Sequence, residues 1–150
     1  DKNTLISGSN DNKIKIWENK VLTKTLHDHT NTISSIIHLE SDKNIIVSGD
    51  SDGSIIFWNI QKKFQPVKNI SRKDYLSIND TEIDILNLLE LPSQNILLIT
   101  TLVSTITFMS LSNYKVLRNL KLEKGIRCLK QLVNDEGLAF TIDKDVIIWK

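Results

Sequence analysis

Residues Ile46–Trp58 read IVSGDSDGSIIFW, in which an apolar run enters a short polar turn and a second apolar run leaves it and ends on tryptophan. Asp52-Gly53 between two runs rich in β-branched residues is among the stronger short-range signals for a β-hairpin. Residues Leu5–Trp17, LISGSNDNKIKIW, have the same arrangement. In both segments an aspartate follows the first serine by four residues, and the tryptophan follows it by ten. The chain is therefore built on a repeated hairpin.

A more divergent copy, LAFTIDKDVIIW, spans Leu138–Trp149, and its Asp143 precedes the tryptophan by six residues, as in the two clearer copies. The apolar segment Thr105–Leu111 aligns with the strand that ends the second copy and places Met109 at the tryptophan position. These positions are separated by 41, 51 and 40 residues. A period near 40 built from short strands is typical of propellers with four strands in each blade. We predict an all-β protein, a partial β-propeller of four-stranded antiparallel blades.

The repeat divides the chain into four units of unequal completeness. We expect a partial blade at 1–26, a blade at 27–70, a blade at 71–122 with a long loop at 71–80, and a blade at 123–150 that lacks its last strand. Apolar content alone would allow a helix at Asp84–Leu91, but its place in the repeat favours a strand. Propellers have about four to eight blades. We therefore expect one of two situations. Either this sequence is part of a longer polypeptide, which we favour, or another chain completes the propeller.

Composition narrows the function classes. The 19 basic residues nearly balance the 18 acidic ones, so no overall charge favours nucleic acid or an anionic membrane. The single cysteine, Cys128, excludes an internal disulfide framework and suggests a reducing compartment. No apolar run approaches the roughly 18–20 residues that span a bilayer. We expect an intracellular protein, cytoplasmic or nuclear, without membrane insertion.

The units resemble WD40 repeats, and the likeness extends over essentially the whole chain. In that family a histidine, a strand serine or threonine, a turn aspartate and the tryptophan form a buried, hydrogen-bonded structural tetrad. The resemblance assigns these roles to His29, Ser48, Asp52 and Trp58 in the second unit, Ser7, Asp11 and Trp17 in the first, and Asp143 and Trp149 in the last. Buried polar groups of this kind must satisfy one another or cost several kcal/mol.

Two other interpretations of these polar residues are weaker. The sequence His27-Asp28-His29 suggests a metal, but alternate residues of an extended segment point to opposite sides and no cysteine or third histidine has ligand spacing. Ser48 with His29 and Asp52 contains the residue types of a hydrolase triad, but the strained G-x-S-x-G turn that exposes a nucleophile is absent. We expect no metal, no cofactor, no small-molecule substrate and no catalysis.

The long loop at 71–80 is the best candidate for a contact with another protein. It accounts for the ten extra residues of its unit and combines charged, aromatic and aliphatic residues on the same propeller face as His29. A tolerated, solvated insertion is the alternative. The expected partner-binding residues are Arg72, Lys73, Tyr75 and Leu76, with Asn10, Asn31 and Ser51 as weaker candidates on the same face.

The resemblance implies a non-catalytic scaffold that mediates protein–protein interactions within a larger intracellular complex. Its expected partners are other protein subunits. One alternative is a propeller associated with nucleic acid or ribonucleoprotein, in which Arg72 and Lys73 would meet phosphate. Another is a peptide-reading adaptor such as a ubiquitin-ligase substrate receptor, but an arginine two residues after Trp-Asp, which such receptors carry, is absent here.

Overall fold

The computed structural model describes residues 3–76, 83–132, 137–142 and 145–149. Within these ranges the chain forms four antiparallel sheets in sequence order. The N-terminal sheet contains β1 (Thr4–Gly8), β2 (Ile14–Glu18) and β3 (Val21–Leu26), and the second sheet contains β4 (Ile33–His38), β5 (Ile45–Asp50), β6 (Ile55–Asn59) and β7 (Gln65–Ile70). The third sheet contains β8 (Ile85–Leu91), β9 (Ile96–Thr101), β10 (Thr105–Ser110) and β11 (Val116–Lys121), and the C-terminal sheet contains β12 (Ile126–Gln131), β13 (Leu138–Ile142) and β14 (Asp145–Trp149).

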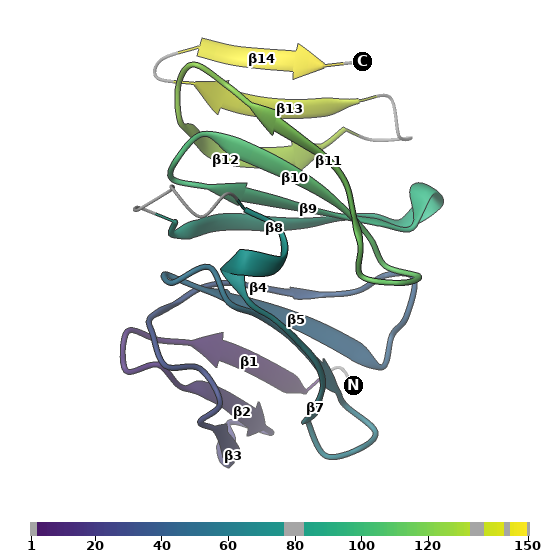
Figure 1. Ribbon diagram of the computed structural model, residues 1–150. Helices are drawn as coiled ribbons and strands as arrows, with labels where there is room; N and C mark the ends of the chain where they lie inside the picture. The colour runs from purple at the N-terminus through teal and green to yellow at the C-terminus, as the bar shows by residue number, and fades with distance from the viewer. Residues whose placement is uncertain (1–2, 77–82, 133–136, 143–144, 150) are drawn as a thin grey trace.

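The sheets lie face to face in one stack, with the N-terminal sheet at one end and the C-terminal sheet at the other (Figure 1). Two short 3₁₀ helices, η1 (Arg72–Asp74) and η2 (Pro92–Gln94), interrupt the connections. The all-β partial propeller predicted from the period is confirmed. The strand predicted around Asp84–Leu91 is also confirmed, as β8.

β-Bulges recur at equivalent positions in successive sheets, which shows that the sheets repeat one structural unit. Each of the inner strands β4, β8 and β12 has one extra residue near its start, and each of the outer strands β3, β7 and β11 has one near its own start. The extra residues of the inner strands are Ser34, Leu86 and Arg127, and those of the outer strands are Thr23, Val67 and Leu117. The third and C-terminal sheets thus repeat the second even where the sequence motif is lost.

Three apolar cores fill the three interfaces between neighbouring sheets. Successive side chains of a strand point to opposite faces, so neighbouring residues belong to different cores. In β5, Ile46 packs towards the N-terminal sheet and Val47 towards the third sheet. In β9, Leu97 packs towards the second sheet and Leu98 towards the C-terminal sheet. Burial on both faces explains why both strands begin with continuous apolar runs, Ile45–Val47 and Ile96–Ile99.

Two glycines allow neighbouring sheets to pack closely against each other. Gly8 and Gly49 hold equivalent positions at the ends of β1 and β5. A Cβ at Gly49 would lie 2.9 Å from the Cδ1 atom of Ile85, and one at Gly8 would overlap the side chain of Ile33. Both isoleucines open the inner strand of the next sheet. The missing side chain therefore lets each inner strand pack directly on the backbone of its neighbour.

Replacing Gly49 with alanine should lower the free energy of unfolding by about 1–3 kcal/mol, because the new methyl group overpacks the interface against Ile85. Urea denaturation followed by tryptophan fluorescence measures the effect. Gly125→Ala is the matched control, since a Cβ there meets no atom closer than 3.7 Å. Equal losses of stability in both variants would contradict this account of the interface.

Candidate functional site

A chain of hydrogen bonds joins the connection between β3 and β4 to strands β5 and β6 of the second sheet. The indole Nε1 of Trp58 lies 2.8 Å from the Oγ atom of Ser48. That hydroxyl lies 2.6 Å from Nε2 of His29, whose Nδ1 lies 2.8 Å from Oδ2 of Asp50. The four residues are between 0% and 6% exposed. They form a buried polar brace inside an apolar core.

The chemistry of the two end groups fixes the direction of the outer bonds of the brace. The Trp58 indole donates to the Ser48 hydroxyl, and the Asp50 carboxylate accepts the Nδ1–H of His29. When the His29 ring is neutral, the Ser48 hydroxyl donates to Nε2. The other carboxylate oxygen of Asp50 accepts the backbone N–H groups of Asp52 and Ser54, at 3.0 and 2.9 Å. The polar side-chain groups of the brace are thus hydrogen-bonded, so their burial carries no penalty for an unsatisfied donor or acceptor.

The structure brings together three of the four predicted residues and replaces the fourth. The predicted carboxylate was that of Asp52, but Asp50 occupies the position, which corrects the prediction. Ser48 and Asp50 are two residues apart on one strand, so their side chains share a face. Asp52 lies in the turn with its side chain 52% exposed, and its Oδ1 is 3.3 Å from a guanidinium nitrogen of Arg72.

The N-terminal sheet has only part of the brace. Trp17 donates to the Oγ atom of Ser7 at 3.0 Å, as Trp58 does to its own serine. Asp11 stays in the exposed β1–β2 turn and pairs with Lys15 at 3.6 Å. Desolvation acts to raise the pKa of Asp11, but the hydrogen bonds from Ser9 and the backbone, together with the lysine charges, outweigh it and lower that pKa.

The other two sheets replace the brace with apolar packing. By register, Ile99 and Met109 in the third sheet correspond to the serine and tryptophan of the second. In the C-terminal sheet the serine position holds Phe140. Trp149 packs edge-on against Phe108, with ring centroids 6.1 Å apart. Asp143, predicted as a tetrad member, lies outside the described residues.

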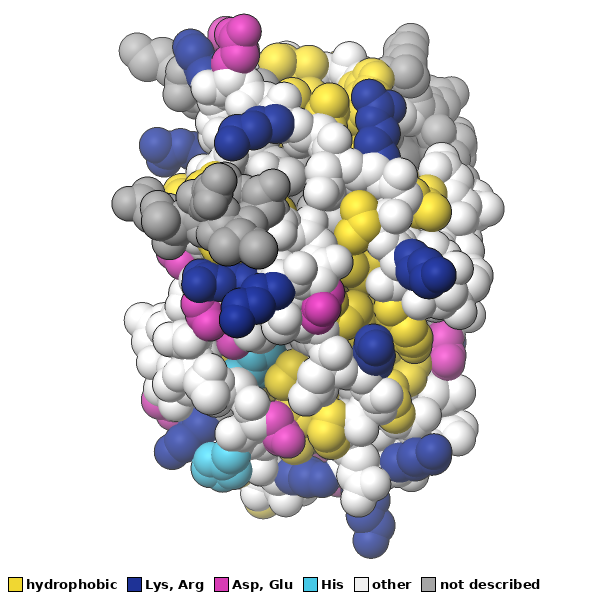
Figure 2. Space-filling view, in the orientation of Figure 1, with side chains coloured by type: hydrophobic (Ala, Val, Ile, Leu, Met, Phe, Trp, Pro, Cys, Tyr) yellow, Lys and Arg dark blue, Asp and Glu magenta, His cyan; other side chains and the backbone are white. Residues whose placement is uncertain are grey.

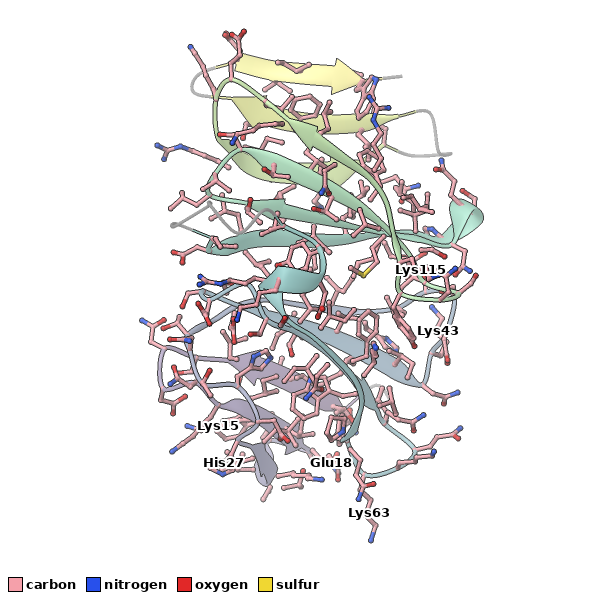
Figure 3. The ribbon with its side chains drawn as sticks, in the orientation of Figure 1. Lys15, Glu18, His27, Lys43, Lys63 and Lys115 are labelled. Carbon is pink, nitrogen blue, oxygen red and sulfur yellow. The ribbon has the colours of Figure 1, made fainter. Side chains whose placement is uncertain are left out.

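The order serine–histidine–aspartate in the brace matches the connectivity of a hydrolase triad. A nucleophile must reach a substrate, but Ser48 is completely buried and its hydroxyl already accepts a bond from Trp58. The geometry therefore suits a structural role. His27 lies at the surface (Figure 3), whereas His29 is buried. Among the described residues no group of three or more histidine, cysteine, aspartate or glutamate side chains could hold a metal ion.

The loop after β7 is anchored in the interface between the second and third sheets. Tyr75 and Leu76 are only 3% and 8% exposed, and both belong to the core there. The Tyr75 hydroxyl donates to the carbonyl oxygen of Gly53 at 2.6 Å, and the Asn119 amide donates to the carbonyl oxygen of Tyr75 at 2.9 Å. Burial, with the carboxylates of Asp50 and Asp52 nearby, raises the pKa of the Tyr75 phenol, so it stays a neutral donor.

This burial corrects the prediction that Tyr75 and Leu76 contact a partner, because both side chains face inward. Arg72 and Lys73 of the same loop remain at the surface. Residues 77–80 of the predicted loop lie outside the described residues.

Sequence reasoning missed a second polar contact between the same two sheets. The Glu90 carboxylate, only 6% exposed, accepts hydrogen bonds from the backbone N–H groups of Glu40 and Ser41 and from the Ser41 hydroxyl. Nearer the start of β8, the Leu88 backbone N–H donates to the Oγ atom of Ser35 at 3.1 Å. No sequence motif predicts these hydrogen bonds, because they depend on how the second and third sheets are aligned when they pack.

The remaining predicted contact residues share one end of the stack. In each sheet the strands run up and down, so the β1–β2 and β5–β6 turns lie at the same end as the connections before β4 and β8. We call this end the loop face, on the left in Figure 1. The predicted residues on it are Asn10, Asn31, Ser51, Arg72 and Lys73.

Comparison with known families identifies the repeat. A family model described as WD40: WD domain, G-beta repeat matches residues 1–18 and 20–59, which reach from the N-terminal sheet to the end of β6. Residues 1–59 of the chain therefore match WD40 repeats. WD40 repeats generally mediate protein–protein interactions, and the family is generally a non-catalytic scaffold. No curated protein matches the chain. In the part of the chain that the structure describes, no helix is long and apolar enough to cross a membrane.

The carboxylate of the brace can be tested by comparing Asp50 with Asp52. Asp50→Ala should lower the free energy of unfolding by about 3–5 kcal/mol, because it leaves a buried histidine without its partner. Asp52→Ala should cost at most about 1 kcal/mol, because its ion pair with Arg72 is exposed. Chemical denaturation of both variants measures the difference. A larger loss of unfolding free energy for Asp52→Ala than for Asp50→Ala would show that Asp52 is the carboxylate of the brace.

The anchoring role of the loop predicts that Tyr75→Phe lowers stability by about 1–3 kcal/mol, because the buried Gly53 carbonyl loses its donor. Leu76→Ala should cost about 2–5 kcal/mol through the cavity that it leaves. Thermal unfolding measures both. Lys73→Ala, in the same loop but exposed, is the control and should stay within about 0.5 kcal/mol of the parent. Unchanged stability in the first two variants would argue for a loop that only rests on the surface.

Proposed function

We propose that this protein is a non-catalytic scaffold that holds partner proteins within a larger intracellular complex, in the cytoplasm or the nucleus. The partner contact that we propose lies on the loop face and centres on Arg72 and Lys73. The observation that best supports this contact is the anchor at Tyr75, three residues after Arg72, which fixes the loop to two sheets. The proposed contact therefore presents charged groups from a rigid support.

The local geometry of η1 adds to this rigidity. The Asp74 carboxylate accepts the backbone N–H of Ser71 at 2.8 Å, and the Asp74 N–H donates to the Ser71 carbonyl at 3.0 Å. The guanidinium of Arg72 is held towards the Asp52 carboxylate at 3.3 Å. Side chains and loops that are ordered before binding lose less entropy when a partner arrives. The loop face should therefore lose little conformational entropy when it binds a partner.

The polar residues around this centre match the rim of a typical protein interface. Asn10 is exposed, and Asn31 and Ser51 are partly exposed in neighbouring turns. Charged and polar rim groups set specificity and association rate more than affinity. Because Arg72 already faces a carboxylate, a phosphate backbone would have to compete with Asp52 for it. This favours a protein partner over nucleic acid.

Reversing the charge of both Arg72 and Lys73 to glutamate should reduce recovery of loop-face partners at least tenfold in affinity purification from the native source. The melting temperature should change little, because both side chains lie at the surface. Lys115→Glu, an exposed charge reversal at the opposite end of the stack, is the matched control and should leave those partners bound. Equal partner recovery with and without the double change would refute this contact.

A further inference from the structure

The near balance of charge in the whole chain hides an uneven distribution. Three segments, 19–26, 60–70 and 111–121, each contain an outer strand and the turn that leads into it. Together they carry eight lysine and arginine residues and no aspartate or glutamate. The rest of the chain has 11 basic and 18 acidic residues, a net charge of −7. We call the three segments the outer rim, and its net charge is +8.

The basic residues recur at equivalent positions in the first three sheets. In each outer strand one of them directly follows the bulged residue, as Lys24 in β3, Lys68 in β7 and Arg118 in β11. The turns that lead into these strands supply Lys20, Lys62, Lys63 and Lys115. The positive charge therefore belongs to the outer rim as a whole and not to one loop.

Two cations of the outer rim are held by contacts that leave their charge intact. The Lys24 ammonium group donates to the carbonyl oxygen of Lys63. The Lys68 ammonium group lies 5.8 Å from the centroid of the Tyr114 ring, which belongs to the next sheet. A carbonyl oxygen and an aromatic ring attract an ammonium group without neutralising it. Both groups can therefore still attract an anionic ligand.

Exposed aliphatic side chains lie among these cations. Val67 and Leu117 are the bulged residues of β7 and β11, and they are 43% and 58% exposed. Val21 and Leu22 of β3 are 63% and 44% exposed. In Figure 1, β7 and β11 pass in front of other strands, and Figure 2 shows on this side a strip of hydrophobic side chains with Lys and Arg side chains beside it. The outer rim thus combines positive charge with apolar surface.

An extended peptide fits this surface poorly. Peptides that bind to a strand edge do so mainly through main-chain hydrogen bonds. Each outer strand is interrupted near its start by a bulge, and β7 also contains Pro66, which has no N–H group to donate. A partner strand could therefore pair with only a few residues of each edge.

Single-stranded nucleic acid also fits less well. Such ligands stack their bases on exposed aromatic side chains. The aromatic residues of the outer rim are Phe64, which is 9% exposed, and Tyr114, whose ring packs edge-on against Phe57 and has Lys68 over it. Seven of the eight cations are lysines, whereas arginine is preferred for bidentate contacts with phosphate. A phosphate backbone would also leave the aliphatic side chains without a partner.

An anionic lipid surface uses both properties of the outer rim. Lysine and arginine are attracted to anionic head groups, and aliphatic side chains gain from the boundary between head groups and acyl chains. We propose that the outer rim, centred on β7 and β11, binds peripherally to the surface of an anionic lipid bilayer. Val67 and Leu117 reach between the head groups, and Lys68 and Arg118 face the lipid phosphates. This goes beyond the proposed function, because it adds a lipid surface to the protein partners of the loop face.

The test measures co-sedimentation of the protein with two kinds of vesicle. One consists of phosphatidylcholine alone, and the other contains about one-third phosphatidylserine, which is anionic. We expect at least tenfold stronger binding to the phosphatidylserine vesicles. This binding should weaken as salt rises, because dissolved ions screen the attraction between the lysines and the lipid charge.

Charge-reversal variants locate the binding surface. Lys68→Glu combined with Arg118→Glu should weaken binding to the phosphatidylserine vesicles at least tenfold, because each cation near an anionic bilayer adds to the attraction. The matched control is Lys43→Glu combined with Lys130→Glu, which changes the net charge equally at exposed lysines outside the outer rim. The control should cost less than about threefold, since charges far from the lipid surface are screened.

Two further pairs of substitutions complete the test. Val67→Ser combined with Leu117→Ser leaves the charge unchanged and should weaken vesicle binding at least about threefold, because apolar contact with the lipid is lost. Thermal unfolding checks that every variant is folded. If reversal at Lys68 and Arg118 disturbs the fold, Lys62→Glu combined with Lys63→Glu in the exposed β6–β7 turn takes its place.

Several results would overturn the proposal. They are no binding to either kind of vesicle, equal binding to both, equal losses in the outer-rim and control lysine pairs, and vesicle binding unaffected by the serine pair. Binding of a single-stranded oligouridine or of polyglutamate without binding of vesicles would also overturn it, in favour of nucleic acid or an acidic protein. Because Arg72 and Lys73 are unchanged in all these variants, loss of lipid binding leaves the loop-face partner test intact.

Discussion

Burial of each central sheet between two neighbours is the constraint on which the structure depends. Each fully buried aliphatic or aromatic side chain contributes about 1.5–3 kcal/mol. A net hydrogen bond contributes about 0.5–1.5 kcal/mol. Packing therefore supplies most of the stability, while the brace around His29 fixes the β3–β4 connection on the second sheet, because any misplaced member would be left buried without a partner. The third and C-terminal sheets pack without this brace, so the stacking of sheets does not require it.

The fold could be predicted from the sequence because repeated strands produce a repeated pattern of residues. The hairpin around Gly53 and the spacing of the tryptophan positions depend on local geometry, and both reappear in the structure. The brace was predicted only in part, because the motif draws attention to the turn aspartate. Asp50 lies two residues after Ser48, and the two-residue period of a strand was the signal that could have identified it.

The loop at 71–76 shows what the sequence could not predict, namely whether its apolar side chains are exposed or buried. Tyr75 and Leu76 have the composition expected of an exposed contact loop, and the same composition also suits a plug between two sheets. Only the position of the neighbouring sheet decides between them. Glu90 shows the same limit, since its donors come from a turn about fifty residues away in the chain. Long-range register is a property of the packed stack and leaves no spacing pattern in the sequence.

The two ends of the stack differ in both shape and charge, although the same strands supply them. At the loop face, a buried tyrosine supports a short 3₁₀ helix with exposed charge. At the opposite end, the β4–β5 and β10–β11 turns carry exposed lysines, Lys43 and Lys115. Because the rigid cores lie between the ends, a change at one end does not require the other end to move.

The bulges of the outer strands have a consequence for solubility. An exposed strand edge offers unpaired backbone groups to any other chain, and long flat edges promote aggregation. Here β3, β7 and β11 are each broken near the start by an extra residue, which increases the local twist. The rim also carries charge and a proline, at Lys24, Pro66, Lys68 and Arg118. The first three sheets can therefore each present an outer backbone edge that is poorly suited to pairing between molecules.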